Sequence, residues 1–232
     1  MMAAVLPVEG EDAVDEYLWR VRIEAEGIPD VVVADPSVEW KHELLADFAE
    51  LRQLIVRWEA IGPPKTEVLR GGELPTVVAR TNVPRMSDED GWGVFFFGKV
   101  SASDSQEVSD GSENAGRRDG TAPHLRLLLQ FDQVLTRRLL EYHAGWLDSV
   151  DTLSRARAVW VYALLARLDK PVHAEVAATI RQLLRRCWQL RNELGAQWGD
   201  GDSACELRLK TLNVLITVTG EFFEQMQHEE QA

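Results

Sequence analysis

The feature that most constrains this chain is a helical segment that has no polar face. The segment runs from Trp160 to Leu168, and a helix that is apolar all round must be surrounded by other helices. Lys170-Pro171 follows it, and we expect the helix to end there because proline disfavours helical geometry in the residue before it. The chain is therefore expected to build an α-helical core around this segment.

A second helix is predicted directly after the proline. Its apolar residues recur at alternating spacings of four and three, which is typical of one stripe of a helix. The stripe consists of Val176, Ile180, Leu183, Cys187, Leu190 and Leu194. The arginines that lie off the stripe, and that give the helix a basic outer face, are Arg181, Arg185, Arg186 and Arg191. Such a face is most often simply solvated, and its functional interpretation is the binding of an acidic partner helix.

The first 98 residues are predicted to form an arm in which short helices alternate with extended chain. An amphipathic stripe that starts at Val14 predicts a helix of about three turns. The β-branched run Val31–Val33 favours a strand-like segment, either as an edge for strand addition to a partner or as a short buried connector. A long amphipathic helix is expected from the N-cap Ser37 to Gly62. Its apolar stripe consists of Trp40, Leu44, Phe48, Leu51, Ile55 and Trp58.

The arm is expected to end in a short aromatic helix, which a linker follows. Residues 61–86 are rich in Gly, Pro and Thr and predict a loop. Ser87 is expected to cap the next helix, which carries Trp92 and Phe95 and ends at Gly98. Residues 99–120 are dominated by Ser, Asp and Gly and predict a disordered linker.

Residues 121–232 are predicted to form a helical bundle. Besides the two helices described first, we expect a helix from His124, a helix capped by Asp132, a loop over 192–202 and a last helix from Leu207 to Met226. Helices that cannot face water, together with one-sided helices, favour a compact bundle. The predicted fold class is mainly α, with an arm over 1–98, a linker over 99–120 and the bundle over 121–232.

Negative charge is concentrated at the N-terminal end. The formal net charge is −13; residues 1–60 hold 14 acidic and 5 basic side chains, whereas residues 121–232 hold 14 and 13. Direct nucleic-acid binding needs clustered Lys and Arg, so this distribution argues against it and favours a basic protein partner. There is no apolar run long enough to span a bilayer, and the two cysteines suit a reducing compartment. We therefore expect a soluble intracellular protein without a membrane partner.

No catalytic or metal-binding pattern stands out in the sequence. The five histidines are scattered, and none has the helical spacing to a second histidine and a carboxylate that a zinc site needs. The run Asp88-Glu89-Asp90 could bind a metal or act in acid–base chemistry, but the start of a solvated helix is the more common role of such a run. We expect no enzymatic activity, no cofactor and no metal.

Four blocks of the chain carry a family resemblance. They are EYLWRVRIEAEGIPDVVVAD (16–35), SDEDGWGVFFFG (87–98), LLEYHAGWL (139–147) and WVYALLARLDKP with IRQLLRRC (160–187). In this order they resemble the Gem-associated protein 2 family. The resemblance implies a non-enzymatic assembly chaperone that grips the Sm proteins D1, D2, F, E and G and restrains premature RNA loading. It also implies binding of an amphipathic helix from the N-terminal part of survival motor neuron protein.

The resemblance further implies two groups of binding residues. The arm would bind Sm proteins through Tyr17, Val21, Ile23, Val31, Val32, Val33, Trp40, Trp92 and Phe95. The bundle would bind the survival motor neuron helix through Trp146, Arg155, Arg157, Trp160, Tyr162, Arg181, Leu184, Arg185 and Trp188. In this family an arginine commonly occupies the position of Val159. The resemblance also implies a cytoplasmic and nuclear location, in gems and Cajal bodies. The alternative that the residues leave open is a generic acidic helical adaptor without an Sm partner.

Overall fold

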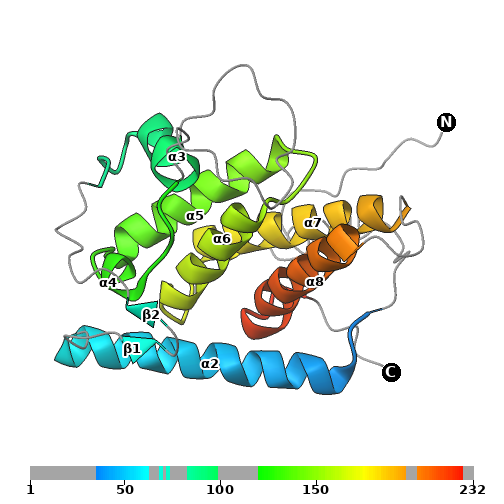
Figure 1. Cartoon of the computed structure of the whole chain (residues 1–232), viewed down its shortest axis with the longest axis horizontal. Helices are drawn as coiled ribbons and strands as arrows, with labels where there is room; N and C mark the ends of the chain where they lie inside the picture. The colour runs from blue at the N-terminus through cyan, green and yellow to red at the C-terminus, as the bar shows by residue number, and fades with distance from the viewer. Residues whose placement is uncertain are drawn as a thin grey trace, which may run out of the picture.

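The computed structural model describes residues 35–62, 68–69, 72–73, 83–98, 120–196 and 203–226. These ranges contain seven α-helices, a π-helical turn and a two-stranded antiparallel sheet, which confirms the mainly α fold class (Figure 1). The helices are α2 (Val38–Ile61), α3 (Glu89–Phe97), α4 (Leu125–Leu128), α5 (Gln133–Asp148), α6 (Arg155–Arg167), α7 (Ala174–Ala196) and α8 (Ser203–Thr217), and the π-helical turn η1 (Val218–Phe222) follows. The strands are β1 (Val68–Leu69) and β2 (Gly72–Glu73), within the predicted loop.

Helix α6 lies among the other described helices, as the absence of a polar face predicts (Figure 1). Contacts reach it from α2, α3, α4, α5 and α8, and Trp160, Leu164 and Leu165 are at most 1% exposed. Its N-cap is Ser154, whose hydroxyl oxygen accepts a hydrogen bond from the Arg157 backbone N–H at 3.3 Å. The prediction that this segment is the centre of a helical core is therefore confirmed.

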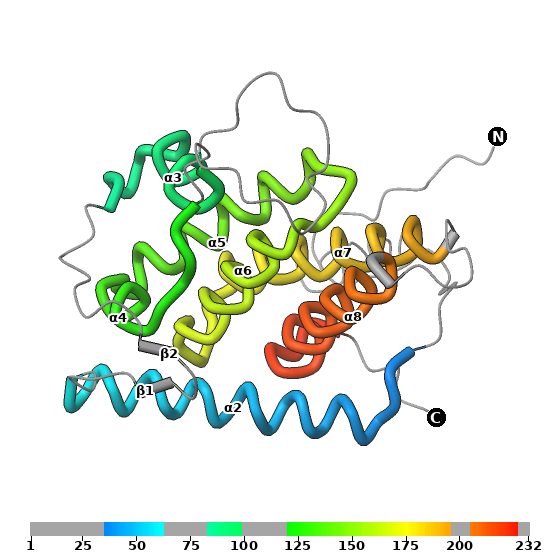
Figure 2. The backbone as a smooth tube through the Cα atoms, in the orientation of Figure 1, coloured from blue at the N-terminus to red at the C-terminus, as the bar shows by residue number. Residues whose placement is uncertain are grey.

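Helix α2 crosses the base of the bundle (Figure 2) and contacts α6, α8 and η1. Its predicted limits are confirmed. Ser37 is the N-cap, with its hydroxyl oxygen 3.3 Å from the Trp40 backbone nitrogen, and Gly62 is the C-cap with a φ of 83°. A positive φ of this size strains any residue that has a Cβ, so glycine is the residue that ends the helix without cost.

Two kinds of interaction hold α2 against α6. Phe48 and Ile55 are the α2 residues that are buried. Arg52 Nη1 donates hydrogen bonds to the carbonyl oxygens of Leu165 (2.8 Å) and Ala166 (3.1 Å) at the C-terminal end of α6. The last carbonyls of a helix lack partners within the helix and carry partial negative charge, so a guanidinium group is well placed there.

Helix α3 attaches to the bundle through aromatic side chains. Trp92 and Phe96 are 0% and 1% exposed, and the ring centroid of Phe96 lies 4.5 Å from that of Trp160. The buried residues of α2 and α3 belong to the same hydrophobic cluster as those of α4–α8. We assigned both helices to an arm over 1–98, and the described packing joins them to the bundle.

Three helix boundaries differ from those predicted. Asp88 is the N-cap of α3 in place of Ser87, because its carboxylate accepts the backbone hydrogen bond that the helix start requires. Helix α7 continues to Ala196 through the start of the predicted loop, and α8 begins at Ser203 instead of Leu207. A glycine costs a helix only about 1 kcal/mol relative to alanine, which burial of neighbouring side chains can offset.

Arg191 does not belong to the outer face of α7, which corrects the prediction. It is 1% exposed, beside Leu190 (3%) and Asn192 (7%). Its place four residues after Cys187 and three after Trp188 puts it on the buried side of the helix. This buried turn stabilises the helix beyond the point where the sequence predicted a loop.

Several predicted elements lie outside the described residues. They are the helix from Val14, the extended run Val31–Val33 and the linker over 99–119. Within the described ranges, each helix is too short or too polar to cross a bilayer.

Replacing Gly120 by alanine is expected to destabilise the protein. A Cβ at this position would overlap the backbone carbonyl of Phe96 at the C-terminal end of α3. The next residue, Thr121, accepts the indole N–H of Trp160 on its carbonyl at 2.8 Å, so the backbone has little room to move. We expect a loss of about 1–3 kcal/mol in the free energy of unfolding, measured by urea denaturation.

Gly145→Ala is the matched control, because a Cβ there would meet nothing within 4 Å among the described residues. Gly145 lies inside α5, so alanine is expected to be neutral or stabilising by about 0.5–1 kcal/mol. An equal loss of stability in both variants would contradict the close contact between Gly120 and α3.

Candidate functional site

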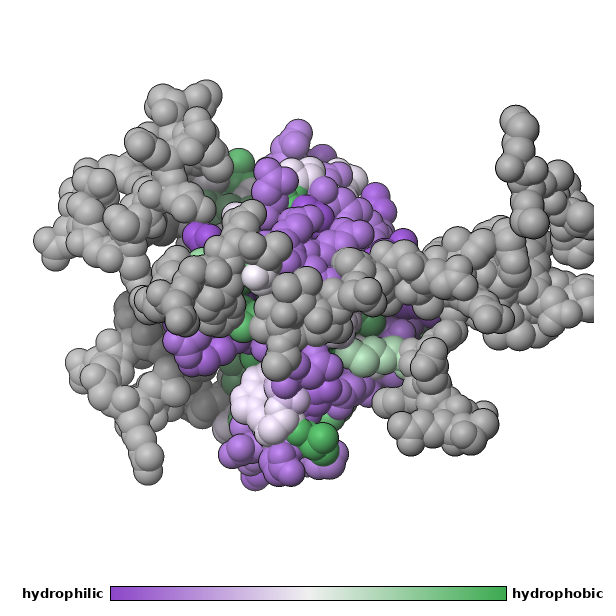
Figure 3. All heavy atoms as spheres, turned by 90° about the vertical axis from the view of Figure 1, so that its right-hand side faces the viewer, coloured by the Kyte–Doolittle hydropathy of each residue, from purple (hydrophilic) through white to green (hydrophobic). Residues whose placement is uncertain are grey.

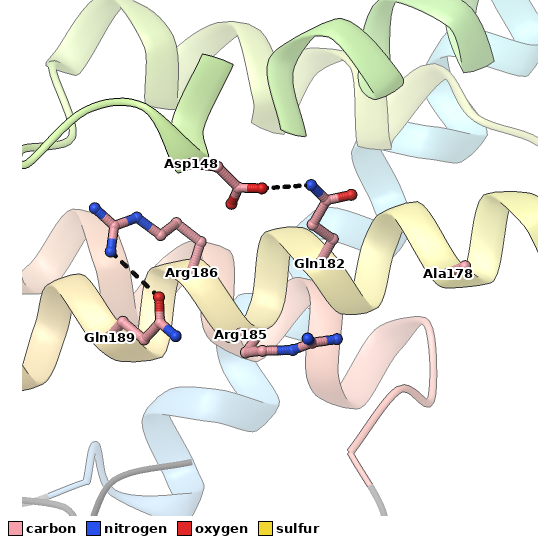
Figure 4. A pocket seen from close by; sticks show the side chains of 6 residues that line it. All are labelled: Asp148, Ala178, Gln182, Arg185, Arg186 and Gln189. Atoms are coloured by element: carbon pink, nitrogen blue, oxygen red, sulfur yellow. Dashed lines mark hydrogen bonds between the residues drawn. The ribbon is translucent and has the colours of Figure 1, made fainter. Parts of the chain in front are cut away.

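A shallow pocket of about 360 Å³ lies on the outer face of α7, beside the end of α5. Its lining residues are Asp148, Ala178, Gln182, Arg185, Arg186 and Gln189. Gln182 Nε2 donates to Asp148 Oδ2 at 2.6 Å, and Arg186 Nη1 donates to Gln189 Oε1 at 3.2 Å (Figure 4). The lining offers charged and amide groups, so it suits polar recognition rather than covalent chemistry.

Arg186 fastens the end of α5 to α7. Its Nε and Nη2 donate to the carbonyl oxygens of Leu147 (3.2 Å) and Val150 (2.6 Å), where a helix end needs partners from outside. Arg185 extends along α7, away from the pair formed by Gln182 and Asp148 (Figure 4). Arg186 therefore has a structural role, and Arg185 is the arginine of the predicted binding group that lines the pocket.

Trp146 and Arg157 border the aromatic cluster formed by α3, α5 and α6. The guanidinium carbon of Arg157 lies 4.5 Å from the ring centroid of Phe97, and burial lowers the pKa of Arg157. The ring of Trp146 stacks on Tyr142 at a centroid distance of 5.8 Å. Both predicted residues are half-buried, so each leaves part of its side chain accessible to a partner.

Other residues of the predicted helix-binding group are accessible on α6 and α7. Arg155 is exposed at the start of α6, and Tyr162 and Arg181 are half-buried. Burial, with the nearby charge of Asp47, raises the pKa of Tyr162. Arg181 Nη1 donates to Gln225 Oε1 at 2.9 Å and so ties α7 to the segment after η1.

Trp160, Leu184 and Trp188 are core residues in this structure. They are 1%, 5% and 8% exposed, respectively, and the indole N–H of Trp160 is already bonded within the chain. The structure therefore divides the predicted helix-binding group in two. Some of its side chains are accessible, whereas Trp160, Leu184 and Trp188 pack in the core. Direct contact of these three with a partner helix stays a prediction.

The predicted Sm-binding group is only partly described. Trp40 is half-buried on α2. Trp92 is fully buried and donates its indole N–H to the Arg85 carbonyl at 3.0 Å, and Phe95 packs against it at 5.3 Å. The residues of this group outside the described ranges are Tyr17, Val21, Ile23, Val31, Val32 and Val33. Trp92 has a packing role, and Sm binding by the group stays a prediction.

A part-buried ion pair that the sequence reasoning missed joins the start of the described chain to α7. Arg191 Nη1 lies 2.9 Å from Asp35 Oδ1, and the Arg191 guanidinium carbon lies 4.9 Å from the Trp188 ring centroid. The signal was present, because Arg191 falls on the buried side of α7 by its spacing from Cys187. The pair sets where the chain enters α2.

His143 is buried among aromatic rings in α5. The Phe96 and Trp146 rings lie 5.0 and 5.3 Å from its centroid, and neither imidazole nitrogen has a hydrogen-bond partner among the described residues. Burial, and secondarily the charge of Arg157, lowers the pKa of His143 to about 3. The imidazole is therefore neutral at physiological pH, and the residues packed around it bury it completely.

The described residues give no sign of metal or thiol chemistry. Within these ranges there is no group of three or more His, Cys, Asp or Glu side chains placed to hold a metal ion. Cys187 is fully buried, and burial raises the pKa of its thiol to about 12. A thiol with so high a pKa is a poor nucleophile, so Cys187 serves as a core side chain.

Asp35→Asn is expected to lower stability, because it removes the carboxylate charge that lies 2.9 Å from the buried Arg191 guanidinium. We expect a loss of about 1–2 kcal/mol in the free energy of unfolding, less than for a fully buried pair because Asp35 itself is 51% exposed. The measurement is urea denaturation at neutral pH. Asp151→Asn, a change of the same kind at an exposed position, is the control; equal effects would argue against the ion pair.

The stability of the protein is expected to fall on acidification because of His143. Its pKa is about 3 in the folded protein and about 6.5 when unfolded, so between these values the unfolded chain binds more protons. Stability is therefore retained above about pH 6.5 and is lost as the pH falls towards 3. Going from pH 7.5 to 5.5, this group alone should remove about 1.4 kcal/mol.

His143→Phe, which keeps an aromatic ring and removes the titrating group, tests this. The drop in the free energy of unfolding between pH 7.5 and 5.5 should be smaller in the variant by about 1.4 kcal/mol. Identical pH dependence of the two proteins would show that His143 does not titrate as its surroundings imply.

Comparisons with known proteins agree with the fold and with the sequence blocks. The family described as "Survival motor neuron (SMN) interacting protein 1 (SIP1)" matches residues 34–226. The Gem-associated protein 2 of Mus musculus is 27% identical, over 97% of this chain and 93% of the relative, and that of Xenopus laevis is 28% identical, over 97% and 96%.

A chain of the solved structure titled "The 8S snRNP Assembly Intermediate" shares the fold. It has a TM-score of 0.54 and 22% sequence identity, and the likeness covers 93% of this chain and 97% of that chain. The family match extends over every described helix, from α2 to η1. The chain therefore belongs to the survival motor neuron (SMN) interacting protein 1 family.

Proposed function

We propose that this chain is a non-enzymatic assembly factor for spliceosomal small nuclear ribonucleoproteins. In this proposal its N-terminal part binds the Sm proteins D1, D2, F, E and G, and its helical part binds the N-terminal helix of survival motor neuron protein. The observation that carries the proposal is the family match over residues 34–226. The names of the relatives and of the structural neighbour support it.

The charge distribution supports the Sm half of the proposal. Residues 1–60 hold 14 acidic and 5 basic side chains, and Sm proteins need positive charge where they bind RNA phosphates. An acidic segment at that surface would compete with RNA and so restrain premature RNA loading. The Asp35–Arg191 ion pair ties the chain directly before α2 to α7.

In the second half of the proposal, the survival motor neuron helix binds the accessible side chains of α6 and α7. Val159 is 43% exposed, and Arg155 precedes it by four residues on the same face of α6. Arg157 is occupied by its contact with Phe97. Arg155 is therefore the residue we propose to supply the positive charge that the family commonly has at the position of Val159. A cytoplasmic and nuclear location is part of the same proposal.

Co-purification with the five Sm proteins and with a synthetic N-terminal survival motor neuron peptide tests the proposal. We expect the full chain to retain both. Failure to bind the Sm proteins would overturn the proposed function and leave a generic acidic helical adaptor as the alternative.

Charge reversal on α6 and α7 tests the location of the peptide site. Arg155→Glu and Arg185→Glu are each expected to weaken peptide binding about tenfold, measured by isothermal titration calorimetry. Arg57→Glu, the same change at an exposed position of α2, should leave the affinity unchanged. If all three variants lose affinity alike, the effect reflects net charge and the proposed location is wrong.

A further inference from the structure

Helix α2 carries apolar side chains on two neighbouring faces. The face towards the bundle contains Phe48 and Ile55, the α2 residues that are buried. A second set falls in one sector roughly 100° wide when drawn at 3.6 residues per turn. This set, which we call the α2 stripe, consists of Trp40, Leu44, Leu51, Leu54, Trp58 and Ile61.

Three members of the α2 stripe are exposed, and the other three, Trp40, Leu44 and Trp58, are half-buried. Leu51, Leu54 and Ile61 are 37%, 43% and 65% exposed. Figure 3 views the molecule from the N-terminal end of α2, where a small hydrophobic patch lies at the lower edge of a mostly hydrophilic surface. Several large apolar side chains exposed along one side of a helix are typical of an interaction surface rather than of single exposed residues.

The attachment of α2 to the bundle does not use the stripe. Lys41 Nζ lies 3.0 Å from Glu221 Oε1, and the Arg167 guanidinium lies 2.5 Å from Glu59 Oε1. Arg52 donates to the end of α6, as described above. These contacts lie on the side of Phe48 and Ile55, so the exposed leucines are not needed to position the helix.

Negative charge lies along the stripe: Glu43 and Asp47 fall within its sector, and Glu39 and Glu50 border it on the side away from the bundle. The acidic residues Glu39, Glu43, Asp47 and Glu50 are all exposed along the first two-thirds of α2. Arg57 is the basic residue on this side in the last third. An occupant lying along the first two-thirds of α2 would therefore meet carboxylates, whereas the charged neighbour of Trp58 and Ile61 on this side is Arg57.

We propose that the α2 stripe is the docking surface for a basic amphipathic helix of a partner protein. The apolar seam of that helix would cover Leu44, Leu51 and Leu54, and its Lys and Arg side chains would face Glu43, Asp47 and Glu50. A second copy of α2 fits less well, because Asp47 and Glu50 would meet like charges at the centre of an antiparallel pair. The same carboxylates repel an anionic membrane surface. The stripe includes Trp40 of the predicted Sm-binding group, but the proposal does not require the partner to be an Sm protein.

Isothermal titration calorimetry of the full chain with two designed helical peptides tests the proposal. Both peptides carry leucines at helical spacing; lysines flank them in one and glutamates in the other. We expect the lysine peptide to bind with a micromolar Kd that weakens as salt is raised, and the glutamate peptide to bind at least about tenfold more weakly. Equal binding of the two peptides overturns the assignment of a basic partner.

A matched pair of leucine variants locates the surface. Leu54→Gln should weaken the lysine peptide about tenfold. Leu207→Gln should leave it unchanged, because Leu207 is a similarly exposed leucine, at 54%, on α8. Equal losses in both variants overturn the location.

Charge removal and sedimentation velocity complete the test. Glu43→Gln combined with Glu50→Gln should weaken the lysine peptide and reduce the salt dependence of its binding. Unchanged affinity in this double variant contradicts the role of these carboxylates. A concentration-dependent dimer that Leu54→Gln abolishes would overturn the proposal in favour of a second copy. Far-ultraviolet circular dichroism confirms that each variant is folded.

Discussion

The burial of Trp160 is the interaction on which the rest of the described structure depends. Its ring lies 4.5 Å from Phe96 of α3 and 6.4 Å from Phe131, which precedes α5. Its indole N–H donates to the Thr121 carbonyl. A buried tryptophan needs both apolar neighbours and a hydrogen-bond acceptor. Segments that are far apart in the chain must therefore converge on α6 before this one side chain is satisfied.

Arginine side chains fasten the helices around that centre. Arg52 and Arg186 donate to carbonyl groups near the ends of α6 and α5, whereas Arg167 and Arg191 pair with carboxylates. A guanidinium group has several donors in a fixed plane, which suits it to such shared contacts. Helix packing in this bundle thus combines apolar burial with charged hydrogen bonds at helix ends. Fewer arginines of α7 are available to a partner than the sequence suggests.

The two apolar faces of α2 show what helical periodicity predicts about burial and what it does not. The sequence predicts one apolar stripe that includes Phe48, Leu51 and Ile55, and the structure buries Phe48 and Ile55 while Leu51 stays exposed. Periodicity indicates which side of a helix is apolar, but the depth of burial depends on the width of the neighbour that covers it. From the sequence alone, the two neighbouring apolar faces of α2 therefore cannot be told apart. The contact with α6 shows which of them is buried.

The candidate binding site shows the same limit of local sequence patterns. The family resemblance implies Arg181, Arg185 and Trp188 as members of one binding group, but the structure buries Trp188 and engages Arg181 with Gln225. The role of Arg191 depends on Asp35, which is 156 positions away in the sequence. Local spacing contains no information about a contact at that distance.

The sequence by itself determined the helical class, the caps at Ser37 and Asp132, the end of α6 before Pro171 and the family, because these rest on local patterns and on blocks of residues in order. Only the tertiary structure decided that α2 and α3 share the core of the bundle, that Arg191 is buried and that Leu51, Leu54 and Ile61 of the α2 stripe stay exposed. Those outcomes follow from competition among several apolar and charged surfaces for a limited buried volume, which is settled only when all the helices are packed together.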